Sequence, residues 1–144
     1  MISASIEIER PQAEVFPYVD DQQKQTEWQT SLVEARIVSE GPTGVGTRFV
    51  QKRQVPGGPR ELLNEITHYD PPTRLSWKGL DGPVRSVGSV TVEPLGESRS
   101  RVTVEFDLIG HGIGKLFAPF ARAQARKQVP SDQEKLKHLV EASA

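Results

Sequence analysis

Alternation of apolar and polar side chains is the main pattern of this chain from residue 2 to residue 108. In residues 2–9, isoleucine or alanine takes every even position, whereas serine or glutamate takes every odd one. Such a period-two pattern predicts a β-strand with one buried face. Similar segments follow, most clearly at residues 31–37, 47–54, 61–69, 75–77, 84–93 and 101–108. We therefore expect about seven strands in an antiparallel meander, polar on the outer face.

Turns and two short helices separate the strands. Glycine- and proline-rich clusters at residues 41–46 and 56–59 predict tight connections. Pro11 suits the first position of a helix, because the missing N–H has no helical partner there. A second short helix over residues 23–29 would bring Trp28 against the core. Both helices fall between the first two strands.

The C-terminal segment, residues 112–142, predicts one long helix. Its large apolar residues recur at helical spacing, at positions 113, 116, 117 and 120 and again at 136, 139 and 140. A continuous helix of this length would be roughly 45 Å long, enough to cross a small domain. The central turns carry Gln124 and Gln128 in place of large apolar residues. We therefore expect the helix to lie across a partly wet cavity.

Two prolines bear on the continuity of this helix. Pro119 is tolerated near a helix start, whereas Pro130 removes a backbone donor in mid-pattern. Residues 131–134 also fit a capping box, which would begin a second helix. One kinked helix and two shorter helices are both compatible with these signals. We favour one kinked helix, because the apolar phase continues beyond Pro130.

Composition narrows the functional classes. The length of 144 residues predicts a single domain, residues 1–144, and the net charge of -1 offers no general attraction for nucleic acid. No apolar run approaches the roughly 20 residues that span a bilayer, so we expect no stable membrane insertion. The alternating N-terminus does not resemble a signal peptide, and cysteine is absent. A cytoplasmic location and a monomer or homodimer are the default expectations. The three histidines are far apart, so we expect neither a metal nor another cofactor.

Three segments together resemble the START-like, polyketide cyclase/dehydrase superfamily. They are residues 10–16 (RPQAEVF) followed by Trp28, residues 44–49 (GVGTRF) and residues 69–77 (YDPPTRLSW). The resemblance implies an α+β helix-grip fold, in which a curved antiparallel sheet grips a long C-terminal helix lying across its concave face. Members of this superfamily bind lipids, quinones, steroids or polyketides, and some catalyse cyclisation, dehydration or hydrolysis. No single catalytic motif runs through the superfamily.

Inward-facing positions of the expected strands and helix predict the residues that line a ligand cavity. The aromatic residues among them suit a hydrophobic core as well as a surface on which a ligand stacks. The candidate ligand-binding residues are Trp28, Phe49, Gln51, Arg53, Ile66, His68, Trp77, Ser86, Val90, Phe106, Phe117, Phe120 and Gln124.

His68 and Arg53 are the two candidates for catalysis. Regular alternation puts His68 on the face of Ile66 and turns Tyr69 outward, and a histidine in an apolar pocket can move a proton near neutral pH. A shift of one residue would instead place His68 on the surface. Arg53 suits the bidentate recognition of a carboxylate or phenolate, unless the strand has already left the pocket.

Three functions are compatible with these features. The first is a carrier or sensor of a small hydrophobic molecule, which needs only the cavity. The second is a cyclase, aromatase or dehydrase that uses polar residues of the same cavity. The third is a protein-interaction domain that uses the outer face of the sheet. We rank it last because that face is polar at residues 3, 5, 7, 9, 103, 105 and 107.

Overall fold

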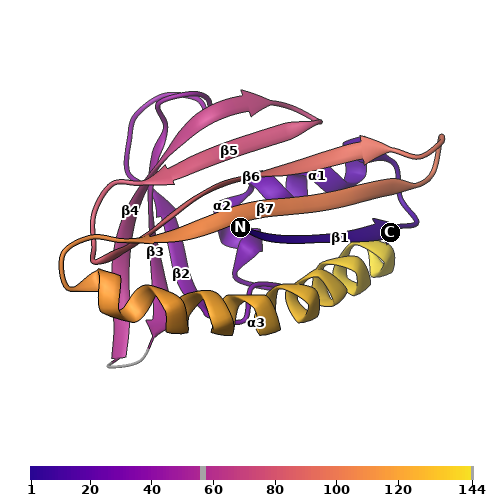
Figure 1. Cartoon of the computed structure of the whole chain (residues 1–144). Coiled ribbons are helices and arrows are strands. Elements are labelled where there is room, and N and C mark those ends of the chain that lie inside the picture. Colours follow the sequence, from indigo (N-terminus) through magenta and orange to yellow (C-terminus); the bar gives the residue numbers. More distant parts are fainter. Residues whose placement is uncertain (56–57, 144) are drawn as a thin grey trace.

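The computed structural model describes residues 1–55 and 58–143 and confirms the predicted element order (Figure 1). Within these residues, seven strands and three helices follow one another along the chain. They are β1 (Ile2–Ile8), α1 (Gln12–Asp20), α2 (Gln22–Gln25), β2 (Leu32–Ile37), β3 (Arg48–Val55), β4 (Gly58–Asp70), β5 (Arg74–Gly79), β6 (Val84–Pro94), β7 (Ser100–Gly110) and α3 (Gly114–Ala142). The predicted turn at residues 56–59 begins with Pro56 and Gly57, which lie outside the described residues.

The strands form one antiparallel sheet in the order β1-β7-β6-β5-β4-β3-β2. Strands β2 to β7 pair with their neighbours in sequence, as expected of a meander, and β1 adds to β7. β1 and β2 therefore occupy opposite edges of the sheet. The helices α1 and α2 lie between them in sequence, so they carry the chain from one edge to the other (Figure 1).

One rung of the sheet positions the aromatic side chains of the inner face, which is the face toward α3. Ile66 pairs with Trp77, Trp77 with Gly88, and Gly88 with Phe106. A side chain at Gly88 would overlap Phe106, so only glycine fits between the two rings. Trp77 and Phe106 consequently meet across Gly88, with their ring centroids 6.4 Å apart.

The hydrophobic core lies at one end of this inner face. It is closed by α1 and by the second half of α3, whose Leu136 and Val140 have no exposed area. Their partners include Ile8, Val15, Phe16, Val19, Leu75, Val92 and Val102. The first turns of α3 contribute none of the core residues in this cluster.

α3 is one continuous helix that contains both Pro119 and Pro130, as favoured above. The predicted capping box is wrong, because residues 131–134 lie inside the helix. Asp132 instead accepts hydrogen bonds from the backbone N–H and the hydroxyl of Thr30, at 3.1 and 2.6 Å. The Gln133 amide donates to the carbonyl oxygen of Ala4 at 3.0 Å. Two buried polar side chains thus attach the middle of α3 to the rest of the fold.

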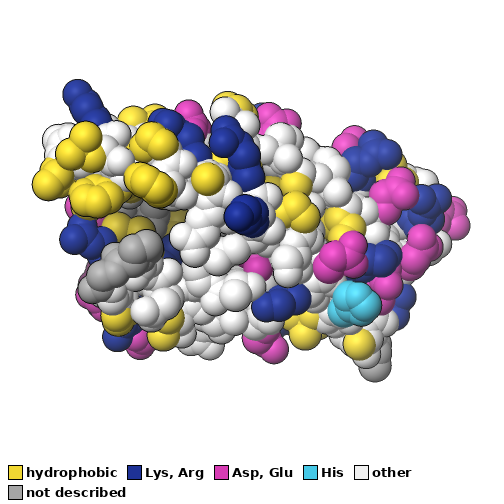
Figure 2. Space-filling model, turned by 60° about the horizontal axis from the view of Figure 1, so that its bottom comes forward, with side chains coloured by type: hydrophobic (Ala, Val, Ile, Leu, Met, Phe, Trp, Pro, Cys, Tyr) yellow, Lys and Arg dark blue, Asp and Glu magenta, His cyan; other side chains and the backbone are white. Residues whose placement is uncertain are grey.

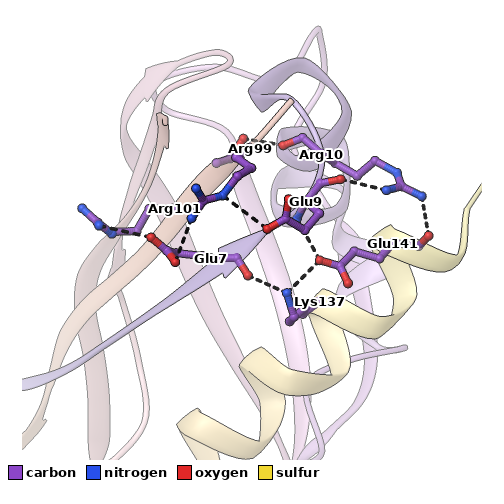
Figure 3. Close-up of polar contacts among 8 residues, drawn as sticks. Glu7, Glu9, Arg10, Arg99, Arg101, Lys137 and Glu141 are labelled. Atoms are coloured by element: carbon purple, nitrogen blue, oxygen red, sulfur yellow. Dashed lines mark hydrogen bonds and ion pairs between the residues drawn. The ribbon is translucent and has the colours of Figure 1, made fainter. Parts of the chain in front are cut away.

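The C-terminal turn of α3 is attached by a polar cluster at the end of β1 (Figure 3). The Glu141 carboxylate accepts hydrogen bonds from the backbone N–H of Glu9 and from Lys137, both at 2.8 Å. Lys137 also donates to the carbonyl oxygen of Glu7 at 2.9 Å, and Arg10 donates to that of Glu141. These contacts hold the second half of α3 beside the edge strand.

Candidate functional site

The inner face of the sheet is closed at one end and open at the other. Beside α1 and the C-terminal part of α3, residues such as Leu75, Val92 and Val102 are at most 3% exposed. Toward the first half of α3, inward-facing side chains are only half-buried. We call this set the open inner strip; it consists of Arg53, Leu62, Trp77, Ser86, Phe106 and Leu108. The strip stays accessible because α3 packs mainly on β1 and β7 and less on β6.

Two aromatic side chains and one hydroxyl lie close together on this strip. The indole N–H of Trp77 donates to the Ser86 hydroxyl at 2.9 Å, which fixes the indole orientation over β6. Phe106 lies on the other side of Gly88, tilted by 43° relative to Trp77. Both side chains are only partly covered by the rest of the fold, so some of their apolar surface stays accessible.

A buried polar network borders the strip on β3. Arg53 donates to Ser31 at 2.9 Å, to Gln29 at 2.6 Å and to Gln51 at 2.9 Å. The Gln51 amide in turn donates to Gln25 at 3.1 Å. The network thus ties β3 to α2 and to the loop that follows it. A guanidinium has five N–H donors, and those of Arg53 make three hydrogen bonds within the described part of the chain. Two N–H donors are not used by these three hydrogen bonds.

Burial changes the electrostatics of this guanidinium. Desolvation lowers the pKa of Arg53 to about 10, and the Asp132 carboxylate acts in the opposite direction. The side chain is therefore still charged at neutral pH. A charged donor group in such surroundings interacts more strongly with an anionic or carbonyl oxygen than it would in water.

His68 lies on the outer face, as the alternative of a one-residue shift predicted, so its candidate position in the cavity is wrong. The register of β4 shifts between Ile66 and His68, which leaves Thr67 as an extra residue opposite β5. One extra residue reverses the alternation beyond it. His68 is consequently exposed, and Tyr69, expected to face outward, packs against the core.

Tyr69 forms a second polar contact at the closed end. Its hydroxyl donates to the Asp20 carboxylate at 2.6 Å, and its ring packs against Phe16. Burial and this carboxylate raise the pKa of Tyr69 to about 12, and burial also raises the pKa of Asp20. The contact joins the end of α1 to β4, away from the open inner strip.

The predicted lining residues of α3 face solvent. Phe117, Phe120 and Gln124 are all exposed, so their expected contact with an enclosed cavity is wrong. The positions that face the sheet in this half of the helix include Gly114 and Ala118, which are buried. Small residues let α3 approach the sheet closely and turn the phenylalanines away from it.

The remaining candidates divide between the core and the strip. Phe49, Ile66 and Val90 belong to the closed core, and Gln51 is buried in the polar network. Trp28 is half-buried, and its indole N–H donates to the carbonyl oxygen of Tyr18 at 3.0 Å, which is a structural role. Arg53, Trp77, Ser86 and Phe106 are the predicted residues on the open inner strip. Trp77 contacts both Ser86 and Phe106, whereas Arg53 lies further along the inner face, where it bonds to Ser31, Gln29 and Gln51.

Sequence reasoning missed the glutamines of α2. Gln22 and Gln25 are buried, and both lie within 3.4 Å of the Gln51 amide. Gln22, Gln25 and Gln29 are spaced three and four residues apart, so they share one side of a helical turn. That spacing was a usable signal. It predicts a polar helix face, but not that the face is buried against β3.

Two surface hollows lie beside α3, on sides other than the strip. One of about 510 Å³ is lined by residues including Glu27, Lys135 and His138, and one of about 360 Å³ by residues including Met1 and Arg126. Among the described residues, no group of three or more histidine, cysteine or acidic side chains is arranged to hold a metal. Across the same residues, no helix combines the length and apolar character needed to span a membrane.

The sequence matches the family described as "Polyketide cyclase / dehydrase and lipid transport" over residues 1–141. The chain belongs to this family. Among curated proteins, none matches the sequence. The predicted family and the helix-grip fold are thus confirmed.

Solved structures of other proteins share the fold at low identity. The Zhui aromatase/cyclase from Streptomyces sp. R1128 superimposes with a TM-score of 0.84 at 13% identity, covering 97% of this chain and 92% of that one. A START superfamily protein from Mycobacterium smegmatis gives 0.79 at 14% identity, covering 97% and 96%. The protein TTHA0849 from Thermus thermophilus gives 0.74 at 21% identity, covering 98% and 97%.

Proposed function

We propose that this chain binds a small, largely apolar molecule on the open inner strip, between the sheet and the first half of α3. The observation that carries this proposal is the partial exposure of Trp77 and Phe106 on the inner face. Covering apolar surface stabilises a complex by roughly 25 cal/mol per Å². A flat or polycyclic guest would place that surface against the two rings. Family membership supports the same class of guest.

Arg53 supplies the polar end of the proposed site. Its side chain is the charged group of the strip, and Gln29, Ser31 and Gln51 hold it in place. A fixed guanidinium recognises a carboxylate, phenolate or carbonyl oxygen with directional hydrogen bonds. We therefore expect the guest to carry one such oxygen at the end that approaches β3.

A fluorescence titration tests the location of the site. The chain has two tryptophans, so Trp28→Phe leaves Trp77 as the only indole reporter. The probe is 8-anilinonaphthalene-1-sulfonate, which joins aromatic rings to one anionic group. Binding should quench Trp77, and Ser86→Phe should weaken binding by about tenfold or more by filling the strip. Val87→Phe is the control, because Val87 lies one residue away on the outer face. Equal losses in both variants would contradict the proposed location.

A second titration tests the role of Arg53. Arg53→Met keeps the apolar stem and removes the donors. It should weaken binding of the sulfonate probe by about tenfold, the effect expected of a hydrogen bond to a charged group. It should leave binding of the uncharged N-phenyl-1-naphthylamine nearly unchanged. Equal effects on the two probes would show that Arg53 acts only through packing.

A cyclase, aromatase or dehydrase activity is the second candidate function. The charged Arg53 on the same inner face favours it, because a fixed cation stabilises the oxyanion of an enolate during carbon–carbon bond formation. Native mass spectrometry of protein purified from its own host would identify a bound guest. Loss of water from that guest during incubation, abolished in Arg53→Met, would establish an enzyme. An unchanged guest released only on denaturation would support a carrier.

A further inference from the structure

The first half of α3 and the residue just before it carry an apolar stripe that faces away from the fold. Ile113, Leu116, Phe117 and Phe120 are 68%, 70%, 54% and 77% exposed. Their spacing of i, i+3, i+4 and i+7 places them on one helix face. Figure 2 shows hydrophobic side chains gathered at the upper left of this view, at the end of the molecule where α3 begins. We call these four residues the α3 stripe. Four large apolar side chains that are each more than half exposed and adjacent on one helix face mark an interaction surface.

The charged side chains of the segment that carries the α3 stripe are all basic. Residues 111–131 contain Lys115, Arg122, Arg126 and Lys127 and no acidic residue, whereas the whole chain has a net charge of -1. Arg122 forms an ion pair with Asp107 of β7 at 3.1 Å. Basic side chains beside an apolar helix face are the combination that binds anionic membrane surfaces.

The exposure and the basic surroundings of the α3 stripe discriminate between three binding partners: a second copy of the chain, another protein and a lipid bilayer. A second copy would bring the same basic side chains against this one, and like charges facing each other disfavour such a dimer. A partner protein would need a groove for a stripe that stands out from the surface. A bilayer interface needs no preformed groove, because headgroups and acyl chains adapt to protruding side chains.

We propose that the first half of α3 docks on an anionic lipid bilayer surface, with the α3 stripe inserted at the headgroup boundary. Lys127 follows Phe120 by seven residues and so lies on the side of the α3 stripe, near the lipid phosphates. The exposed Lys115 and Arg126 lie on another side of the helix and add to the long-range attraction for anionic lipid. α3 stays on the surface of the bilayer, because its second half is packed in the core. The docking requires no guest on the open inner strip, so it is independent of the function proposed above.

Vesicle co-sedimentation tests the docking with the full chain and no added guest. The protein should sediment with vesicles of equimolar phosphatidylcholine and phosphatidylglycerol and remain in solution with pure phosphatidylcholine. Leu116→Glu and Phe120→Glu should each reduce binding by about tenfold or more. Val45→Glu is the matched control, because Val45 is an apolar side chain 71% exposed in another part of the surface. It should bind like the unsubstituted protein.

Charge reversal tests the electrostatic contribution to docking on the bilayer. The double variant Arg126→Glu, Lys127→Glu should lose about tenfold or more in affinity for the anionic vesicles. Because all these positions are exposed, circular dichroism and thermal unfolding should stay unchanged. Absence of vesicle binding by the unsubstituted protein would overturn the proposal. So would a dimer in sedimentation velocity that Phe120→Glu dissociates, since the stripe would then serve a second copy.

Discussion

The two halves of α3 have similar numbers of large apolar residues but opposite environments. In the second half, Leu136 and Val140 are completely buried. In the first half, the large apolar residues are exposed, and the buried positions are Gly114 and Ala118. Ala118 and Leu136 are 18 residues apart, which is about five helical turns, so they lie on the same side of α3. Helical spacing therefore shows where side chains share a face, but not which face meets the sheet.

The difference arises from how closely α3 approaches its neighbours. At Gly114, any side chain would overlap the backbone of Pro83 in the β5–β6 connection. The helix therefore begins in close contact with that loop. Only small residues, Gly114 and Ala118, fit on the inner side of its first turns. Large residues can then enter the core only further along, where α1 and the sheet provide space. The first half is thus available for interactions outside the fold.

The largest expected difference between the halves is in the free energy of unfolding. Leu136→Ala should lower it by about 2–5 kcal/mol, because a buried side chain is replaced by a cavity. Leu116→Ala should change it by less than about 0.5 kcal/mol, because that side chain is already exposed. Urea unfolding followed by circular dichroism measures both. Similar losses in the two variants would show that the first half is also packed in solution.

Replacing one glutamine in each half of α3 should give an intermediate difference in the free energy of unfolding. Gln133→Ala should lower the free energy of unfolding by about 1–3 kcal/mol, since it removes a buried amide that donates to Ala4 and Val102. Gln124→Ala, in the exposed first half, is the control and should be neutral. The same urea experiment applies. A neutral Gln133→Ala would mean that water replaces the amide without cost.

The smallest effect concerns the polar cluster in Figure 3 and depends on pH. The hydrogen bonds from Glu9 and Lys137 hold the pKa of Glu141 below its ordinary value. A carboxyl with a lowered folded-state pKa stabilises the fold above its unfolded pKa, and this contribution is lost as the pH falls through the folded-state pKa. Glu141→Gln should therefore lower Tm slightly near neutral pH. The difference should shrink as the pH falls below the ordinary pKa of glutamate and vanish below the folded-state pKa. A difference that persists in acid would assign the effect to packing.

Local patterns accounted for the fold because each element depends on nearby residues. Alternation in β1 and β7, Pro11 at the start of the first helical segment and the helical phase through Pro130 all correspond to elements of the structure. The inner-face positions of Arg53, Trp77, Ser86 and Phe106 followed from the same alternation, because their strands have no irregularity before these residues.

The incorrectly placed residues depend on single events that local patterns do not contain. Thr67 adds one residue to β4, and this alone moves His68 outward and Tyr69 inward. The glutamines of α2 share a helical side, but only their contact with Gln51 makes them part of a buried network. The exposure of Phe117 and Phe120 depends on which side of α3 reaches the sheet.

The sequence by itself determined the order of the elements, the antiparallel meander and the family. These follow from side-chain periodicity and turn residues, which act over a few positions. Only the tertiary structure decided which parts of the inner face are covered. Coverage depends on distances between elements far apart in sequence, such as α3 and the β5–β6 connection. The open inner strip and the α3 stripe both result from that packing, and both proposals rest on it.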